Sequence, residues 1–104
     1  GYASEKNYLN FPLPANCGNE VYLKTLEKAL NMVDIAKFEV VAVSAGFDNH
    51  SGDLASLGLT EKGYREIGGR IKALAKPTFF VLEGGYQGER VGNAIDQLLK
   101  AYEN

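Results

Sequence analysis

The sequence predicts an α/β fold in which short parallel strands alternate with helices. Two short apolar runs carry no charged residue and no polar alternation, which is typical of strands covered on both faces. Three longer segments repeat apolar residues every three or four positions, as the buried faces of helices do. Their order is helix, strand, helix, strand, helix, and two buried strands joined through a helix form a parallel, right-handed unit. We therefore expect a parallel sheet with helices on both faces.

Size, charge and cysteine content limit the class of protein. The chain has 104 residues, with 11 Lys and Arg against 13 Asp and Glu, so residues 1–104 are expected to form one domain. Such balanced charge argues against a nucleic-acid partner. No apolar run approaches the roughly 18 residues that cross a bilayer, so no membrane partner is expected. The single cysteine, Cys17, excludes an internal disulfide and favours a reducing, cytoplasmic location.

The first third of the chain is expected to contain a loop and a helix. Residues 1–19 read as loop with one short strand around Tyr8–Leu13, ended by its prolines. From Glu20 to about Val33, apolar residues at helical spacing predict the first helix.

The centre of the chain predicts a strand followed by a helix. Val40–Ala45 is short, apolar and rich in valine, and it ends at Gly46. Thr60 is expected to cap a helix that ends before Pro77. Gly68 and Gly69 inside that helix cost about 1 kcal/mol each relative to alanine, so we expect its backbone to lie close against the sheet there.

The last third predicts a second strand and a closing helix. Thr78–Leu82 is apolar and is followed by Gly84 and Gly85. Helical spacing then predicts a final helix through the following residues: Val91, Ala94, Ile95, Leu98, Leu99 and Tyr102.

Chemistry is expected in the two loops that follow the strands, because ligands of open parallel sheets bind beyond the carboxyl ends of the strands. The first loop contains Asp48, His50 and Asp53, which are of the residue types that bind divalent metals. The same composition is typical of a plain turn, so both interpretations stay open. In the second loop Tyr86 follows two glycines, and its phenol can either donate a hydrogen bond to an oxyanion or simply pack.

Three ordered motifs extend these observations. They are Val43–Asp53 (VSAGFDNHSGD), Leu57–Thr60 with Gly63-Tyr64, and Leu82–Tyr86 (LEGGY). Together they resemble the C-terminal part of the histone deacetylase family, which also includes acetylpolyamine amidohydrolases and acetoin-utilisation proteins. Asn10–Pro14 (NFPLP) resembles the strand and loop that precede them.

The resemblance implies a zinc-dependent amidohydrolase of the arginase-like, three-layer α/β/α fold with a parallel sheet. Its substrates would be acetylated lysine or acetylated polyamine. It implies that Asp53 is a zinc ligand and that Tyr86 is the catalytic phenol, while Leu59, Gly84 and Gly85 line the substrate pocket. Zinc would polarise the amide carbonyl, and the phenol would donate to the same oxygen. The family's own Asp-x-His ligands lie upstream, so Asp48 and His50 receive no role.

The chain departs from the family pattern in ways that matter. The family uses a further Asp and His on the zinc and a pair of adjacent histidines, whereas His50 is the single histidine here. Leu54 stands where the family often has proline. We therefore expect the C-terminal part of a deacetylase-like catalytic domain, with an incomplete zinc site, inactive alone and prone to self-association. Alternatives are a small flavodoxin-like module that binds an anion at the Gly84–Gly88 loop, or an inactive structural remnant.

Overall fold

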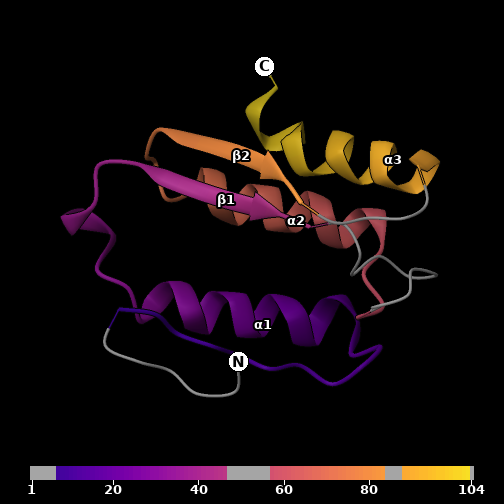
Figure 1. Cartoon of the computed structure of the whole chain (residues 1–104), viewed down its shortest axis with the longest axis horizontal. Helices are drawn as coiled ribbons and strands as arrows, with labels where there is room; N and C mark the ends of the chain where they lie inside the picture. The colour runs from indigo at the N-terminus through magenta and orange to yellow at the C-terminus, as the bar shows by residue number, and fades with distance from the viewer. Residues whose placement is uncertain (1–6, 47–56, 84–87, 104) are drawn as a thin grey trace.

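Figure 1 shows the computed structural model of the chain, which describes residues 7–46, 57–83 and 88–103. The predicted alternation of helices and strands is confirmed. Within the described ranges, no helix is long and apolar enough to cross a membrane. The elements in chain order are α1 (Gly18–Asn31), a 3-10 turn η1 (Ile35–Lys37), β1 (Val41–Ala45), α2 (Glu61–Lys72), β2 (Thr78–Leu82), α3 (Gly88–Leu99) and a 3-10 turn η2 (Lys100–Tyr102).

The two described strands form a parallel pair, as the sequence predicts. Their register runs from Val41 opposite Thr78 to Ala45 opposite Leu82. The ladder continues by one hydrogen bond at each end, because the Val41 amide donates to Pro77 O (2.9 Å) and the Glu83 amide donates to Ala45 O (3.0 Å). The strands therefore end at the same level, and the loops that follow them leave from neighbouring positions.

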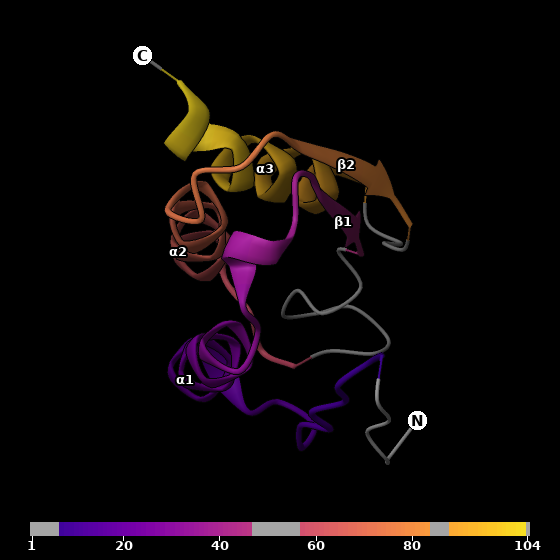
Figure 2. The same ribbon diagram turned by 90° about the vertical axis from the view of Figure 1, so that its left-hand side faces the viewer.

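The helices form one layer on one face of this sheet (Figures 1 and 2). α2 and α3 lie against the strands, and α1 lies beside α2. On the covered face, Val43 and Phe80 pack against the core. On the other face, Ala42, Ser44, Phe79 and Val81 are exposed. The second helical layer that the sequence predicts is not among the described residues.

The core fills the space between the strands and the helical layer. It is assembled from α1, β1, α2, α3 and the residues just before α2. Its buried hydrophobic members are Leu23, Ala45, Leu59, Tyr64, Ile67, Ile71, Ala94 and Leu98. The apolar spacing predicted for the second and last helices is thereby confirmed, since α2 and α3 supply most of the buried side chains.

The short strand expected around Tyr8–Leu13 is reduced to a single β-bridge residue, Tyr8. Residues 9–14 form neither helix nor strand, because Pro12 and Pro14 have no amide hydrogen for a sheet ladder. This segment instead follows α1, where Phe11 and Leu13 line a hollow of about 160 Å³ together with Tyr22 and Leu26. The N-terminal segment thus shields the apolar side of α1.

The closing helix is shorter than predicted. α3 ends at Leu99, and Tyr102 belongs to the 3-10 turn η2. The Tyr102 ring still packs edge-on against Phe80, with ring centroids 5.9 Å apart, and Lys72 Nζ lies 5.1 Å from the Tyr102 ring centroid. The C-terminal turn is therefore tied both to β2 and to α2.

Adjacent glycines in α2 have different roles. A Cβ on Gly68 would collide with the backbone carbonyl of Leu98 in α3, whereas a Cβ on Gly69 would meet nothing within 4 Å. The expectation that both glycines lie against the sheet is therefore wrong. Gly68 permits a close crossing of two helices, and Gly69 faces solvent.

Alanine substitutions at these two glycines are expected to change the free energy of unfolding in opposite directions. Gly68→Ala is expected to lower the free energy of unfolding by about 1–3 kcal/mol, because backbone atoms of α3 must move to admit the methyl group. Gly69→Ala is expected to raise it by up to about 1 kcal/mol, because alanine favours a helix interior. Urea unfolding followed by circular dichroism measures both, and equal effects at the two positions would contradict the helix crossing.

The phenol of Tyr22 in α1 lies in a partly buried environment that disfavours its ionised form. Burial raises the pKa of its phenol above the ordinary value of 10.0, and the neighbouring Cys17 raises it further. Above about pH 10 the unfolded chain loses this proton while the folded chain retains it. Stability contributed by the protonated phenol is therefore present below pH 10 and is lost as the pH rises through the raised pKa.

The ordinary pKa of tyrosine is about 10, so the effect is sought between about pH 9.5 and pH 11. In this range we expect the free energy of unfolding to fall less steeply in Tyr22→Phe than in the parent chain, because phenylalanine has no proton to lose. Urea titrations at several pH values measure the slope. Tyr8→Phe, at an exposed position, is the matched control. Identical slopes for the parent and Tyr22→Phe would refute the assignment.

Candidate functional site

The candidate site is the edge of the sheet at which both strands end. In Figure 1 the carboxyl ends of β1 and β2 lie at the same end of the molecule as the amino ends of α1, α2 and α3. The amino end of a helix carries partial positive charge, which favours anions and developing negative charge. Each helix also has one acidic residue in its first turn, namely Glu20, Glu61 and Glu89. This is the edge at which the sequence predicts chemistry.

Glu83 fixes the end of β2 to the end of β1. The Ser44 hydroxyl donates a hydrogen bond to Glu83 Oε1 at 3.1 Å, and the Glu83 amide donates to Ala45 O at 3.0 Å. Glu83 directly precedes Gly84 in the LEGGY motif. Its contacts therefore set where the second motif loop leaves the sheet, a positioning role that the sequence analysis did not assign.

The start of α2 is held by a residue that the sequence analysis missed. Asn19 of α1 accepts a hydrogen bond from the Thr60 amide (3.0 Å) and donates one from Nδ2 to Thr60 Oγ1 (2.7 Å). Thr60 is the N-cap residue of α2, as predicted, but its side chain does not cap the helix. Asn19 instead holds Thr60 itself in place from another helix, through the Thr60 amide and hydroxyl.

Two glycines make room for this contact. A Cβ on Gly63 would overlap Asn19 Oδ1, so α2 approaches α1 only because position 63 has no side chain. Gly58 has a φ of +76°, which favours glycine, and the Gly18 amide donates to Leu57 O at 2.7 Å. The segment entering α2 is therefore anchored to the beginning of α1. No local sequence pattern signals this contact, because Asn19 and Thr60 lie 41 positions apart in the chain.

Most residues proposed for the site lie outside the described residues. These are Asp53, Tyr86, Gly84 and Gly85, together with Asp48 and His50. Leu59 is described, and its side chain is 1% exposed within the core, so it contributes packing here. Its predicted role in a substrate pocket stays a prediction. The described residues contain no group of three or more His, Cys, Asp or Glu that could hold a metal ion.

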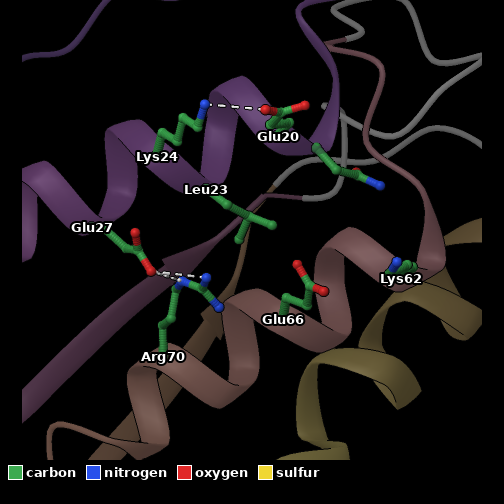
Figure 3. A pocket seen from close by; sticks show the side chains of 8 residues that line it. Glu20, Leu23, Lys24, Glu27, Lys62, Glu66 and Arg70 are labelled. Atoms are coloured by element: carbon green, nitrogen blue, oxygen red, sulfur yellow. Dashed lines mark hydrogen bonds and ion pairs between the residues drawn. The ribbon is translucent and has the colours of Figure 1, made fainter.

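A cleft between α1 and α2 is the alternative location for a site (Figure 3). It encloses about 370 Å³, and Leu23 and Glu66 are directed into the gap between the helices. Arg70 contacts Glu27 through two nitrogens, at 2.9 and 3.0 Å, and Lys24 contacts Glu20 at 3.1 Å. Acidic and basic side chains balance along its walls, so the cleft favours no charged ligand. It is a seam between two helices.

The Asn19 contact predicts a measurable coupling. Asn19→Ala is expected to lower the free energy of unfolding by about 1–2 kcal/mol, because it removes two hydrogen bonds to Thr60. Gly63→Ala displaces the same side chain, so the double variant should cost less than the sum of the two single variants. Urea unfolding of the parent, the two single variants and the double variant measures the coupling. Asn31→Ala, at the exposed end of α1, is the control. Additive losses would contradict the contact.

Comparison with known proteins identifies the family to which the chain belongs. The profile described as "Histone deacetylase domain" matches residues 1–102. The chain belongs to the histone deacetylase family. It is 39% identical over 88 residues to a probable deacetylase of Archaeoglobus fulgidus, covering 78% of this chain and 24% of that protein. It is 30% identical over 112 aligned positions to acetylpolyamine amidohydrolase 1 of Pseudomonas aeruginosa, covering 99% of this chain and 32% of that protein.

A solved structure supports the same family. The chain superposes on the acetylpolyamine aminohydrolase of Burkholderia pseudomallei with a TM-score of 0.81 and 26% identity, covering 90% of this chain and 28% of that one. The deacetylase-like α/β fold in incomplete form is thereby confirmed, and the match favours this family over a flavodoxin-like module. The chain spans between about a quarter and a third of the length of these relatives.

Proposed function

We propose that this chain supplies part of the active site of an amidohydrolase that removes acetyl groups from acetylated lysine or acetylated polyamines. The parallel pairing of β1 and β2 is the observation that supports this most directly. Ala45 and Leu82 are register partners, so the VSAGFD loop and the EGGY loop start side by side on one edge. Two relatives named as acetylpolyamine amidohydrolases align with 99% of this chain, at 30% and 29% identity.

The proposed roles are those of two side chains. Asp53 offers a carboxylate oxygen as one zinc ligand, and zinc when bound supplies Lewis-acid polarisation of an amide carbonyl. Tyr86 donates its phenolic proton in a hydrogen bond to the substrate oxygen as negative charge develops there. Gly84 and Gly85 leave space for an acyl group beside that phenol. The described residues do not by themselves form a zinc site.

As a consequence, residues 1–104 are proposed to act as the C-terminal portion of a deacetylase-like catalytic domain. A catalytic zinc takes about three protein ligands, and the matching motif offers one, so the chain alone is proposed to be inactive. A cytoplasmic location is part of the same proposal, since a free thiol such as Cys17 persists in a reducing compartment.

The test is a chimera in which this chain replaces the matched segment of the Burkholderia acetylpolyamine aminohydrolase. Asp53→Ala is expected to abolish bound zinc, because it removes a ligand. Tyr86→Phe is expected to keep the zinc and lower turnover of an acetylpolyamine by about 10²–10³-fold, because one oxyanion donor is lost. Metal analysis and product release measure the two effects separately.

Controls for this experiment lie at exposed positions of the same residue types. Asp34→Ala and Tyr8→Phe should leave both zinc content and turnover unchanged. Zinc retained in Asp53→Ala, or full turnover in Tyr86→Phe, would refute the corresponding role. A folded parent chimera with no turnover would refute the proposed activity.

Self-association of the isolated chain belongs to the same proposal. The uncovered face of the sheet presents Phe79 and Val81, which are 53% and 47% exposed. Apolar surface of this kind favours association between copies. Sedimentation at rising concentration is expected to show a concentration-dependent increase in mass, and a strictly monomeric chain at high concentration would contradict it.

A further inference from the structure

The loop that carries Asp53 is joined to the described part of the chain at two places. It leaves β1 after Ala45, whose carbonyl accepts a hydrogen bond from the Glu83 amide at 3.0 Å. The chain is described again from Leu57, shortly before α2. The sheet therefore fixes the beginning of this loop, and the contacts of Leu57 and the residues after it fix the end to which the loop returns.

The beginning of α1 holds this return end. The Gly18 amide donates to Leu57 O at 2.7 Å, and Asn19 makes two hydrogen bonds to Thr60, at 3.0 and 2.7 Å. These contacts lie on both sides of Leu59, which is buried in the core. Burial of an apolar side chain is non-directional, whereas hydrogen bonds depend on angle. The core therefore anchors the return end, and the hydrogen bonds on either side of Leu59 set its direction.

The backbone of the return end packs directly on the backbone that opens α1. Gly18 and Gly58 have φ values of +86° and +76°, a left-handed conformation that favours glycine. A Cβ on Gly58 would lie 3.4 Å from Gly18 N and 3.5 Å from backbone atoms of Asn16. Because no side chain separates the two segments, a shift at the start of α1 is transmitted to the return end of the loop.

The Asn19–Thr60 pair lies at the surface, near the candidate site. Thr60 is exposed, and its side chain does not cap α2. Figure 1 shows the amino ends of α1 and α2 at the end of the molecule where β1 and β2 terminate. Hydrogen bonds of this kind add modestly to stability, because water competes for both partners. Their larger effect is on the position of Thr60, and so on the path by which the loop reaches α2.

We propose that Asn19 is a positioning residue for the amidohydrolase reaction, acting through Thr60 on the loop that carries Asp53. Its two hydrogen bonds hold the return end of that loop beside the edge where the strands terminate. A displacement of about 1 Å at a reacting group can lower turnover about 100-fold, so a residue that touches no substrate can control the rate. This inference rests on the proposed function, because the path of the loop affects turnover only if Asp53 acts there.

The experiment compares two substitutions of Asn19 in the chimera with the Burkholderia aminohydrolase. Asn19→Leu has a similar volume and removes both hydrogen bonds to Thr60. Asn19→Asp keeps both, because a carboxylate accepts from the Thr60 amide and from the Thr60 hydroxyl, which rotates to donate. The kcat for an acetylpolyamine is expected to fall about tenfold or more in Asn19→Leu and to stay within about twofold of the parent in Asn19→Asp.

Two controls separate positioning from a general loss of stability. Gly68→Ala destabilises the same helix at its crossing with α3, where a Cβ would meet the Leu98 carbonyl. Asn31→Leu places the same substitution at the exposed far end of α1. At a temperature at which every variant is folded, both controls are expected to keep the parental kcat. A loss of turnover in either control equal to that in Asn19→Leu would overturn the positioning role.

Hydrogen exchange in the 104-residue chain is a readout that does not depend on activity. Thr60 is exposed, and its amide donates to Asn19 Oδ1. Exchange of this amide, followed by nuclear magnetic resonance, is expected to accelerate about tenfold or more in Asn19→Leu and to stay at the parental rate in Asn19→Asp. Amides of β1 and β2 should change less, because they pair within the sheet. A parental rate at Thr60 in Asn19→Leu, or equal acceleration in the strands, would overturn the proposal.

Failure of the proposed function is distinguished from failure of the positioning role. A folded parent chimera without turnover would refute the proposed function and, with it, the role of Asn19. An active parent whose Asn19→Leu variant keeps full turnover would overturn the positioning role alone and leave the proposed function standing.

Discussion

The parallel pairing of β1 with β2 is the constraint on which the rest of the molecule depends. Because Ala45 faces Leu82 across the ladder, the two loop motifs that resemble the family leave the sheet from adjacent points. Parallel strands require a crossover, and α2 provides it while burying Ile67 and Ile71. The connecting helix α2 therefore also contributes buried side chains to the core, so this one segment affects both the topology of the sheet and the stability of the fold.

Side chains that are missing shape the helical layer as much as those that are present. Gly68 lets α2 approach the backbone of α3 at Leu98, and Gly63 lets it approach Asn19 of α1. Both contacts lie on α2, which is thus the helix that sets the spacing of the other two. Larger residues at either position would separate the helices and open the core around Leu59 and Tyr64.

The sequence predicts the elements well and their contacts less well. Helical spacing and the two apolar runs identify α1, α2, α3 and both strands within a few residues, because those patterns are properties of single segments. The strand expected near Tyr8–Leu13 does not extend beyond Tyr8, because its prolines remove ladder donors. The Asn19–Thr60 and Ser44–Glu83 contacts join residues that are 41 and 39 positions apart, and no local pattern encodes such a pairing. The family motifs give Asp53 and Tyr86 through resemblance, and these two residues lie outside the described ranges.

Strands that are apolar on both sides carry little information about which side faces inward. In an alternating strand a slip of one residue exposes the whole hydrophobic set, and this penalty fixes the register. Here such a slip would exchange Phe80 for Phe79 or Val81 against the helices, with almost no change in apolar burial. The alignment is instead held by specific hydrogen bonds at the strand ends, above all those made by Glu83. The hydrogen bonds at the ends of the strands therefore decide which side chains of this small sheet face the helices. Its apolar centre would allow either Phe80 or its neighbours Phe79 and Val81 to face them.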